Sequence, residues 1–288
     1  MLMAIVIVFN CIHLIISMKI TVLVDNIANE GSGLNAEHGL SFWLQTDEGN
    51  FLVDVGATSL FAENACKMGI DIADADYLIL SHAHVDHVGG LSAFLNINRK
   101  AKIYLSSYVC GRNCYSTRRG IKRDISIDHN LLQQHKERFI FVEGNTEITS
   151  SVRLICEIPA IFPVPMANAT LLANDEQDDF LHEIAVAIDS NVGTSILSPC
   201  THRGILNILD AMNGCKVVNF IGGLHLLDSD EKNIFESAED IEFLSREISN
   251  RNISLCTGHC TGKVAKDILS RELGDNFKEF YSGFTMNL

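Results

Sequence analysis

Short apolar runs alternate with longer segments whose apolar residues recur at helical spacing. In the segment 235–249, for example, Ile241, Phe243, Leu244 and Ile248 follow the helical pattern. This pattern predicts helices at 58–68, 90–96, 203–212, 235–249 and 262–272. The apolar runs predict strands at 19–25, 39–46, 50–55, 77–80, 102–105, 139–142, 152–156, 183–189, 193–198, 216–221, 253–256 and 277–281. Such an alternation favours mixed sheets covered by helices.

Three segments stand apart from this alternation. Residues 106–136 are polar and irregular, which predicts an insertion or lid, and 163–180 predicts a second loop. Residues 1–17 are almost wholly apolar and run directly into the first predicted strand. No Lys or Arg precedes them and no small-residue cleavage site follows, so we interpret them as an N-terminal extension, either a misread upstream start before Met18 or a membrane anchor. An extra buried strand or helix is the third alternative.

The amino-acid composition limits the classes of protein to which the chain can belong. A chain of 288 residues with 47% hydrophobic content is long enough for one large globular domain, which we place at 18–288. Its net charge of −14 argues against a nucleic-acid partner, and a membrane partner is expected only if 1–17 is an anchor. Nine cysteines without a regular framework indicate reduced thiols and predict a cytoplasmic protein.

The stretch SHAHVDHVGG at 81–90 holds three histidines and an aspartate within six positions, directly after the apolar run YLIL. In an extended segment, side chains alternate, so His82, His84 and Asp86 would project from one side. Gly89 and Gly90 would then allow the bend that brings His87 round. A lone histidine here would more often cap a helix or face solvent. A cluster of imidazoles and a carboxylate instead predicts a site for zinc, or for iron or manganese.

The motif HAHVDH resembles the metal-binding motif of the metallo-β-lactamase fold superfamily, and VDVG at 53–56 resembles its preceding strand and turn. Further segments follow in the order seen in one branch, whose archaeal and bacterial members are similar to the dihydropterin synthase of methanopterin biosynthesis: EHGLS at 37–41, SPCTHRGILNIL at 198–209, IGGLHLLD at 221–228 and GHCTG at 258–262. The resemblance implies an α+β fold, a four-layer αββα sandwich with metals in a cleft at one edge of the two sheets.

The resemblance also implies a set of ligands for one or two divalent ions, zinc being the first expectation. His82 and His84 would bind one metal, and Asp86 and His87 the other. His202 and His259 follow later strands, as ligand loops should, whereas His225 is expected either to bind metal or to contact substrate. The usual bridging carboxylate has no counterpart, because no Gly-Asp pair follows a strand after position 100. Glu157 is a further candidate, unless it is simply solvated.

Other residues are expected to support the site. Asp54 would accept a hydrogen bond from a metal-bound histidine, unless it only forms the turn before Gly56. Glu37 and His38 are expected in the cleft wall. Five cations concentrate at 111–123, and guanidinium groups bind phosphate in pairs of hydrogen bonds. If this segment folds over the cleft, its arginines become candidates for substrate binding; otherwise they form a solvated face. These candidates are Arg118, Arg119 and Arg123.

Together these features predict a metal-dependent hydrolase that uses activated water on a small phosphorylated or otherwise anionic substrate, with Asp86 also accepting a hydrogen bond from that water. Two alternatives remain open. The same metals can assist the loss of pyrophosphate in a transferase of the dihydropterin synthase type. The chain can also be a metal-containing sensor or binding module without turnover.

Overall fold

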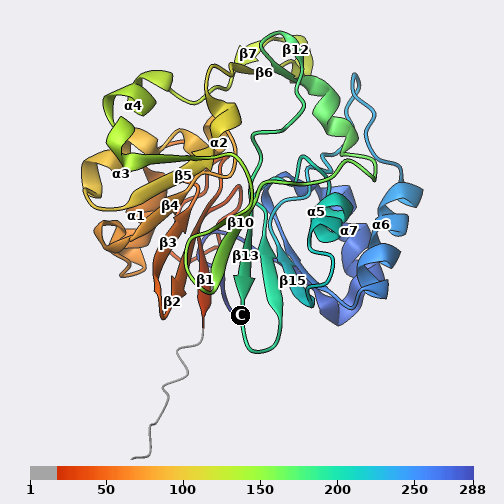
Figure 1. Cartoon of the computed structure of the whole chain (residues 1–288). Coiled ribbons are helices and arrows are strands. Elements are labelled where there is room, and N and C mark those ends of the chain that lie inside the picture. Colours follow the sequence, from red (N-terminus) through yellow and green to blue (C-terminus); the bar gives the residue numbers. More distant parts are fainter. Residues whose placement is uncertain (1–17) are drawn as a thin grey trace, which may run out of the picture.

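A computed structural model describes residues 18–288, so our interpretation of residues 1–17 falls outside the described part (Figure 1). The first half of the chain forms a seven-stranded sheet in the order β18-β1-β2-β3-β4-β5-β8. Its strands are β1 (Lys19–Val24), β2 (Ser41–Thr46), β3 (Gly49–Val53), β4 (Tyr77–Ile79), β5 (Lys102–Ser106), β8 (Phe139–Val142) and the C-terminal β18 (Thr285–Asn287). The C-terminal strand β18 forms one edge of this sheet and pairs antiparallel with β1.

The second half forms another seven-stranded sheet, in the order β17-β16-β15-β14-β13-β10-β9. Its strands are β9 (Thr146–Glu147), β10 (Val152–Ile155), β13 (Ala185–Asp189), β14 (Thr194–Leu197), β15 (Val217–Ile221), β16 (Ser254–Thr257) and β17 (Phe277–Glu279). The two sheets face each other, and side chains such as Phe42, Phe51, Val186 and Leu197 fill the core between them.

Helices cover the outer faces of both sheets, which completes the four layers of an αββα sandwich (Figure 1). The first sheet carries α1 (Leu60–Lys67), α3 (Leu91–Ile97) and α4 (His129–Gln134), whose apolar side chains join one outer core. The second sheet carries α5 (Ile205–Ala211), α6 (Ala238–Asn250) and α7 (Lys263–Leu273), which bury a second outer core. Within residues 18–288, no helix combines the length and apolar character needed to cross a bilayer.

The apolar pattern located the main elements correctly, since each predicted strand and helix overlaps an observed one. Its errors lie in short or polar pieces. In α6, Phe243 is half exposed, whereas Ile241 and Ile248 are buried as the helical spacing predicts. The strand β18 was not predicted, because the alternation in TMN is too short to be distinctive.

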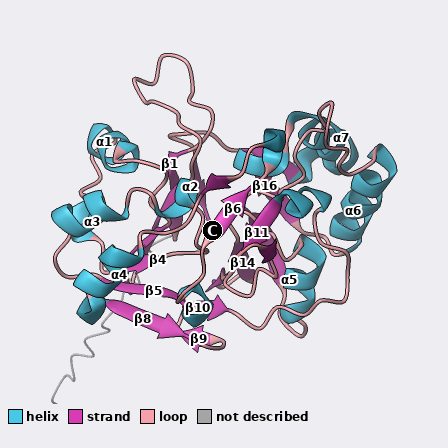
Figure 2. Cartoon of the chain, turned by 90° about the horizontal axis from the view of Figure 1, so that it is seen from above, coloured by secondary structure: helices cyan, strands magenta, loops and turns pink. Residues whose placement is uncertain are grey.

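The segment 106–136 is not the irregular stretch that its polarity suggested. It contains β6 (Cys114–Ser116), β7 (Arg123–Asp124) and α4. The strands β6 and β7 join β11 (Leu171–Ala173) and β12 (Glu176–Gln177), from the second predicted loop, in a separate sheet of order β12-β11-β6-β7. Seen from above, β6 and β11 lie over the meeting line of the two large sheets (Figure 2). The two polar segments therefore fold together as one lid.

The arrangement of strands gathers the chemistry at one edge. The strands β3, β4, β5 and β8 run parallel, as do β14, β15, β16 and β17. Because the carboxyl ends of parallel strands share an edge, the loops that follow β3, β4, β14, β15 and β16 all emerge beneath the lid. All histidines of the predicted metal site lie in these loops.

Candidate metal centre

The segment after β4 is shaped by a carboxylate and a short helix rather than by one extended run. Asp54, directly after β3, accepts hydrogen bonds from the backbone N–H of Ser81 and from its hydroxyl, both at 2.7 Å. His84 is extended, with ψ 139°, and α2 (Val85–Val88) begins immediately after it. The predicted alternation therefore ends at His84, because this helical turn carries Asp86 away from the other two side chains and brings His87 back toward His82.

The two glycines after this turn serve close packing and not an unusual backbone angle. Both have ordinary right-handed conformations, with φ −63° at Gly89 and −75° at Gly90. A Cβ atom would lie 2.2 Å from the carbonyl oxygen of Ala57 at Gly89, and 2.2 Å from that of Val55 at Gly90. The absence of side chains lets this segment lie directly against the loop after β3.

The first group of donors consists of His82, His84 and His202, each of which has a ring nitrogen within 4.8 Å of one from each of the other two. All three residues are buried, and none of their Nε2 atoms has a hydrogen-bond partner. Burial lowers the pKa of His84 to about 3 and holds the pKa values of His82 and His202 well below the ordinary value, so the imidazoles are neutral. Three converging neutral imidazoles without partners are a donor set that fits a divalent metal.

The loop that carries His202 is fixed by buried polar contacts. The Glu183 carboxylate accepts hydrogen bonds from the backbone N–H groups of His202 and Arg203, both at 2.7 Å. Asn168, from the lid, lies 3.0 Å from His202 Nδ1 through its Oδ1 atom and also donates to the His202 carbonyl. Burial raises the pKa of Glu183 to about 7. Two residues that the sequence analysis did not single out therefore orient His202.

A second group of donor atoms lies beside the first. The Nε2 atoms of His87 and His259 are 3.2 Å apart, and the Asp86 Oδ2 atom lies 3.6 Å and 3.5 Å from them. The Asp54 carboxylate accepts a hydrogen bond from His87 Nδ1 at 2.7 Å, which leaves Nε2 to face the group. Burial alone would raise the pKa of Asp86, but the facing His87 and His259 lower it well below the usual range. This set fits a second metal.

Two cysteines and one histidine complete the centre. The Cys200 Sγ atom lies 3.3 Å from His87 Nε2 and 3.4 Å from Cys260 Sγ. His225 packs against His202 with ring centroids 4.2 Å apart, and neither of its ring nitrogens has a partner. Cys200 and Cys260 were not predicted as part of the site, because isolated cysteines among nine give no spacing signal.

Four of the nine non-glycine residues with positive φ in the described part of the chain lie in these loops. Positive φ angles occur at Asp54 (59°), Thr201 (60°), His225 (52°) and His259 (49°). A non-glycine residue in such a conformation costs of order 1–3 kcal/mol and persists where surrounding contacts enforce it. Part of the backbone strain in residues 18–288 therefore lies where the donor atoms converge.

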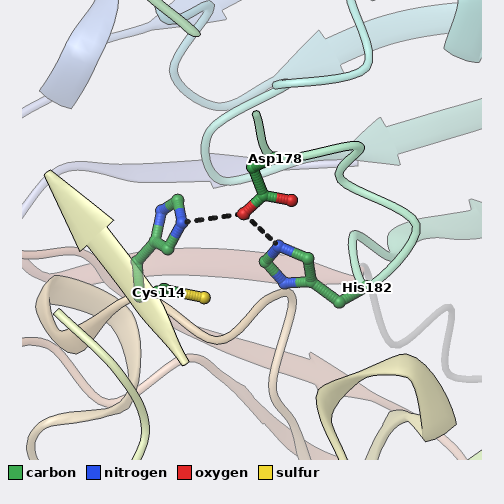
Figure 3. Close-up of side chains that lie close together, drawn as sticks. Cys114, Asp178 and His182 are labelled. Carbon is green, nitrogen blue, oxygen red and sulfur yellow. Dashed lines mark hydrogen bonds and ion pairs between the residues drawn. The ribbon is translucent and has the colours of Figure 1, made fainter. Parts of the chain in front are cut away.

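A buried cluster behind His84 connects the centre to the lid. Asp178 and His182 point toward one another, with Cys114 beside them (Figure 3), and Asp178 Oδ2 lies 3.3 Å from His182 Nε2 and 4.0 Å from His84 Nε2. Both His182 nitrogens have partners, since Nδ1 accepts from the backbone of Ala83. The other Asp178 oxygen pairs with Arg112 at 2.7 Å. This cluster is thus a hydrogen-bonded support that fastens the lid.

A cavity of about 630 Å³ separates the donor groups from the lid. Its lower wall includes His84, Asp86, Cys200, His202, His225 and His259, and its upper wall includes Arg118, Arg119 and Arg123. The five cations of 111–123 therefore divide: three line the cavity, Arg112 pairs with Asp178 and Asp179, and Lys122 pairs with Asp175.

The cavity wall contains one of the two residues expected there from the loop after β1. His38 lines it and lies 3.5 Å from the Asp86 carboxylate. Glu37 does not line the cavity. Its carboxylate instead accepts hydrogen bonds from the backbone N–H groups of Ala57 and Thr58, which fixes the loop after β3. Glu157 is also absent from the site, because it is exposed and accepts a hydrogen bond from Asn145.

Comparison with known proteins defines the class. The sequence profile of the metallo-beta-lactamase superfamily matches residues 34–110, which include the HAHVDH motif. The crystal structure of Tm1679, described as a metal-dependent hydrolase of the beta-lactamase superfamily, superposes with a TM-score of 0.78 at 28% identity, over 94% of this chain and 99% of that one. Residues 34–110 thus match the metallo-beta-lactamase superfamily, and the chain has the corresponding fold.

Among curated proteins, a relative with 26% identity is the 7,8-dihydropterin-6-methyl-4-(beta-D-ribofuranosyl)-aminobenzene-5'-phosphate synthase of Methanocaldococcus jannaschii. The match covers 93% of this chain and 95% of that protein. A diphosphatase of the PhnP family shares the fold, with a TM-score of 0.54 at 13% identity over 94% of this chain and 98% of that one.

Proposed function

We propose that the protein is a metal-dependent hydrolase that acts on a small phosphorylated substrate. The observation that carries this proposal is the cavity itself, which has two sets of metal-type donors on one wall and three arginines on the opposite wall. A phosphoryl group needs both kinds of contact, since metals and guanidinium groups each neutralise its oxygens. The likeness to Tm1679 at 28% identity supports the hydrolase class.

In this proposal His82, His84 and His202 hold one divalent ion, and Asp86, His87 and His259 hold a second. Zinc suits these imidazole and carboxylate donors best. A bound divalent ion supplies Lewis-acid chemistry, because it polarises a phosphoryl oxygen and makes water acidic near neutral pH. His225, whose ring nitrogens have no partner, is assigned to substrate or metal contact.

The chain's own side chains supply position and proton transfer. Arg118, Arg119 and Arg123 bind the phosphate oxygens from above. The Asp86 carboxylate accepts a hydrogen bond from the attacking water and orients it. His38, whose side chain is 72% exposed and whose Nε2 atom is 3.5 Å from Asp86, can carry the proton onward to solvent.

A transferase that releases pyrophosphate is the second candidate function. It is favoured by the 26% identity to the M. jannaschii synthase over 93% of this chain. The same arginines would then hold the pyrophosphate group while a second substrate attacks. The two functions differ in whether an acceptor is required.

One assay separates the two reactions. Metal-loaded protein is incubated with a panel of phosphate esters, and with a pterin pyrophosphate in the presence and absence of an arylamine acceptor, while phosphate and pyrophosphate are measured. A hydrolase releases product without an acceptor. Pyrophosphate release that depends strictly on the arylamine would replace the hydrolase by the transferase, and no release with any substrate would contradict both.

The lid arginines provide a second test. Replacing Arg118, Arg119 and Arg123 by Gln should raise KM for a phosphorylated substrate and leave the metal content unchanged. Each direct charge-assisted hydrogen bond that is lost costs about 1.5–3 kcal/mol, or roughly tenfold or more in affinity. Arg246→Gln, on the exposed face of α6 and outside the cavity, is the matched control. Equal KM values for the triple variant and this control would exclude the lid from substrate binding.

A further inference from the structure

One sulfur atom, the Sγ atom of Cys200, lies close to both groups of donor atoms. In many two-metal sites a shared ligand lies between the ions, yet after position 100 this chain has no Gly-Asp pair at a strand end. The Cys200 Sγ atom lies within 4.8 Å of donor atoms from both groups: His82 and His87 in one set, His202 and His225 in another, and His259 and Cys260 in a third.

The surroundings of Cys200 distinguish it from an ordinary buried cysteine. It lies in the loop directly after β14, is 3% exposed, and lines the cavity. Its Sγ atom is 3.3 Å from the Nε2 atom of His87, whereas Cys256, in β16, is buried among apolar side chains between the two sheets. A thiol that only fills space is expected in the second environment and not in the first.

We propose that the Cys200 sulfur is a metal ligand shared by the two donor groups, in the place of a bridging carboxylate. The inference rests on the metal centre of the proposed function but not on the identity of the substrate. Binding converts the thiol to a thiolate: the S–H bond breaks, its proton goes to solvent, and a metal–sulfur bond forms without oxidation.

A sulfur ligand has a consequence for the choice of metal. Thiolate favours zinc, iron and cobalt, whereas an all-oxygen bridge also accommodates manganese and magnesium. Cys200→Asp should therefore keep both metal positions but shift the preference of the centre toward manganese. This shift is measurable as a change in the ratio of zinc to manganese bound in competition.

Cobalt provides a direct spectroscopic test that does not depend on activity. The wild-type protein loaded with cobalt should show the ultraviolet thiolate-to-cobalt charge-transfer band, and Cys200→Ser and Cys200→Asp should lose it entirely. Cys256→Ser is the matched control and should retain the band, because Cys256 lies between the two sheets and outside the cavity lining. A full-intensity band in Cys200→Ser, or its loss in Cys260→Ser alone, would overturn the assignment of Cys200.

X-ray absorption on the zinc-loaded wild-type protein covers the case in which the Cys200 variants do not fold. A sulfur neighbour at about 2.3 Å from zinc is expected, and a shell of nitrogen and oxygen alone would refute the proposal. The outcomes also separate the two hypotheses. A charge-transfer band without turnover of any phosphorylated compound leaves the sulfur ligand in place and contradicts the proposed function. Turnover of a phosphorylated compound without any metal–sulfur contact supports the proposed function and contradicts the sulfur ligand.

Discussion

Asp54 offers the sharpest test of how the centre is supported. Its buried carboxylate accepts three hydrogen bonds at 2.7 Å: from the backbone N–H of Ser81, from the Ser81 hydroxyl and from His87 Nδ1. Asp54→Asn keeps the shape of the side chain and removes its charge. The carbonyl oxygen of an amide has two lone pairs, so it can accept at most two of the three hydrogen bonds.

The expected loss of stability follows from the number of hydrogen bonds that the amide can accept. At least one donor is left buried without an acceptor, which costs about 1–3 kcal/mol of unfolding free energy. The orientation of His87 is also lost, and removal of such a supporting contact typically lowers metal affinity 10–100-fold, or about 1.4–2.8 kcal/mol. We expect the loss of affinity at the second metal position, where His87 contributes, and little change at the first.

The assay is calorimetric zinc titration of metal-free protein, with chemical unfolding in the presence of a chelator as a separate measure of stability. Asp71→Asn is the matched control, because Asp71 is exposed and accepts a single hydrogen bond from the backbone of Ala73, a capping role that asparagine fills equally well. If Asp54→Asn binds two zinc ions with wild-type affinity, the argument that this carboxylate orients His87 is wrong.

Three further changes have defined outcomes. His202→Ala should lose bound metal, measured by elemental analysis, whereas His129→Ala, whose ring hydrogen-bonds to the backbone carbonyl of Arg112 and does not line the cavity, should retain it; equal retention would remove His202 from the ligand set. Glu183→Gln should cost about 1–3 kcal/mol in chemical unfolding, because its amide nitrogen cannot accept the second backbone N–H of the His202 loop; an unchanged midpoint would contradict this. A chain truncated to begin at Met18 should fold and bind metal, as judged by circular dichroism and zinc content, because β1 begins at Lys19; its aggregation would assign 1–17 to the fold.

The sequence predicted the layers of the fold because apolar runs and helical spacing are local properties. The run YLIL marks β4 without reference to the rest of the chain. The same local reasoning missed α2, since a helix of four residues that begins inside HAHVDH has too few turns to show a period. It also missed the pairing of β6 with β11, because neither three-residue strand is distinctive until the lid folds.

The residues of the candidate site also differ in how much local sequence signal they carry. His82, His84, Asp86 and His87 could be named as candidate ligands from the sequence because six consecutive positions contain all four. Cys200 and Glu183 have no such local signal. The contacts of Cys200 arise only when the loop after β14 meets those after β4 and β16, and the contacts of Glu183 arise when the segment before β13 meets the loop after β14.

The separation of the donor residues along the chain also links metal binding to folding. The HAHVDH segment offers four donors within six residues in an unfolded chain, more than the other loops of the candidate site, while His202 and His259 follow strands of the other sheet. A metal ion can therefore bind weakly to the unfolded chain at this segment, and it gains its remaining ligands only after the two sheets dock. The ion stabilises the native protein only by the difference between these two affinities, since binding to the unfolded chain offsets part of the gain. Excess zinc should accordingly slow unfolding more than it accelerates the first steps of folding.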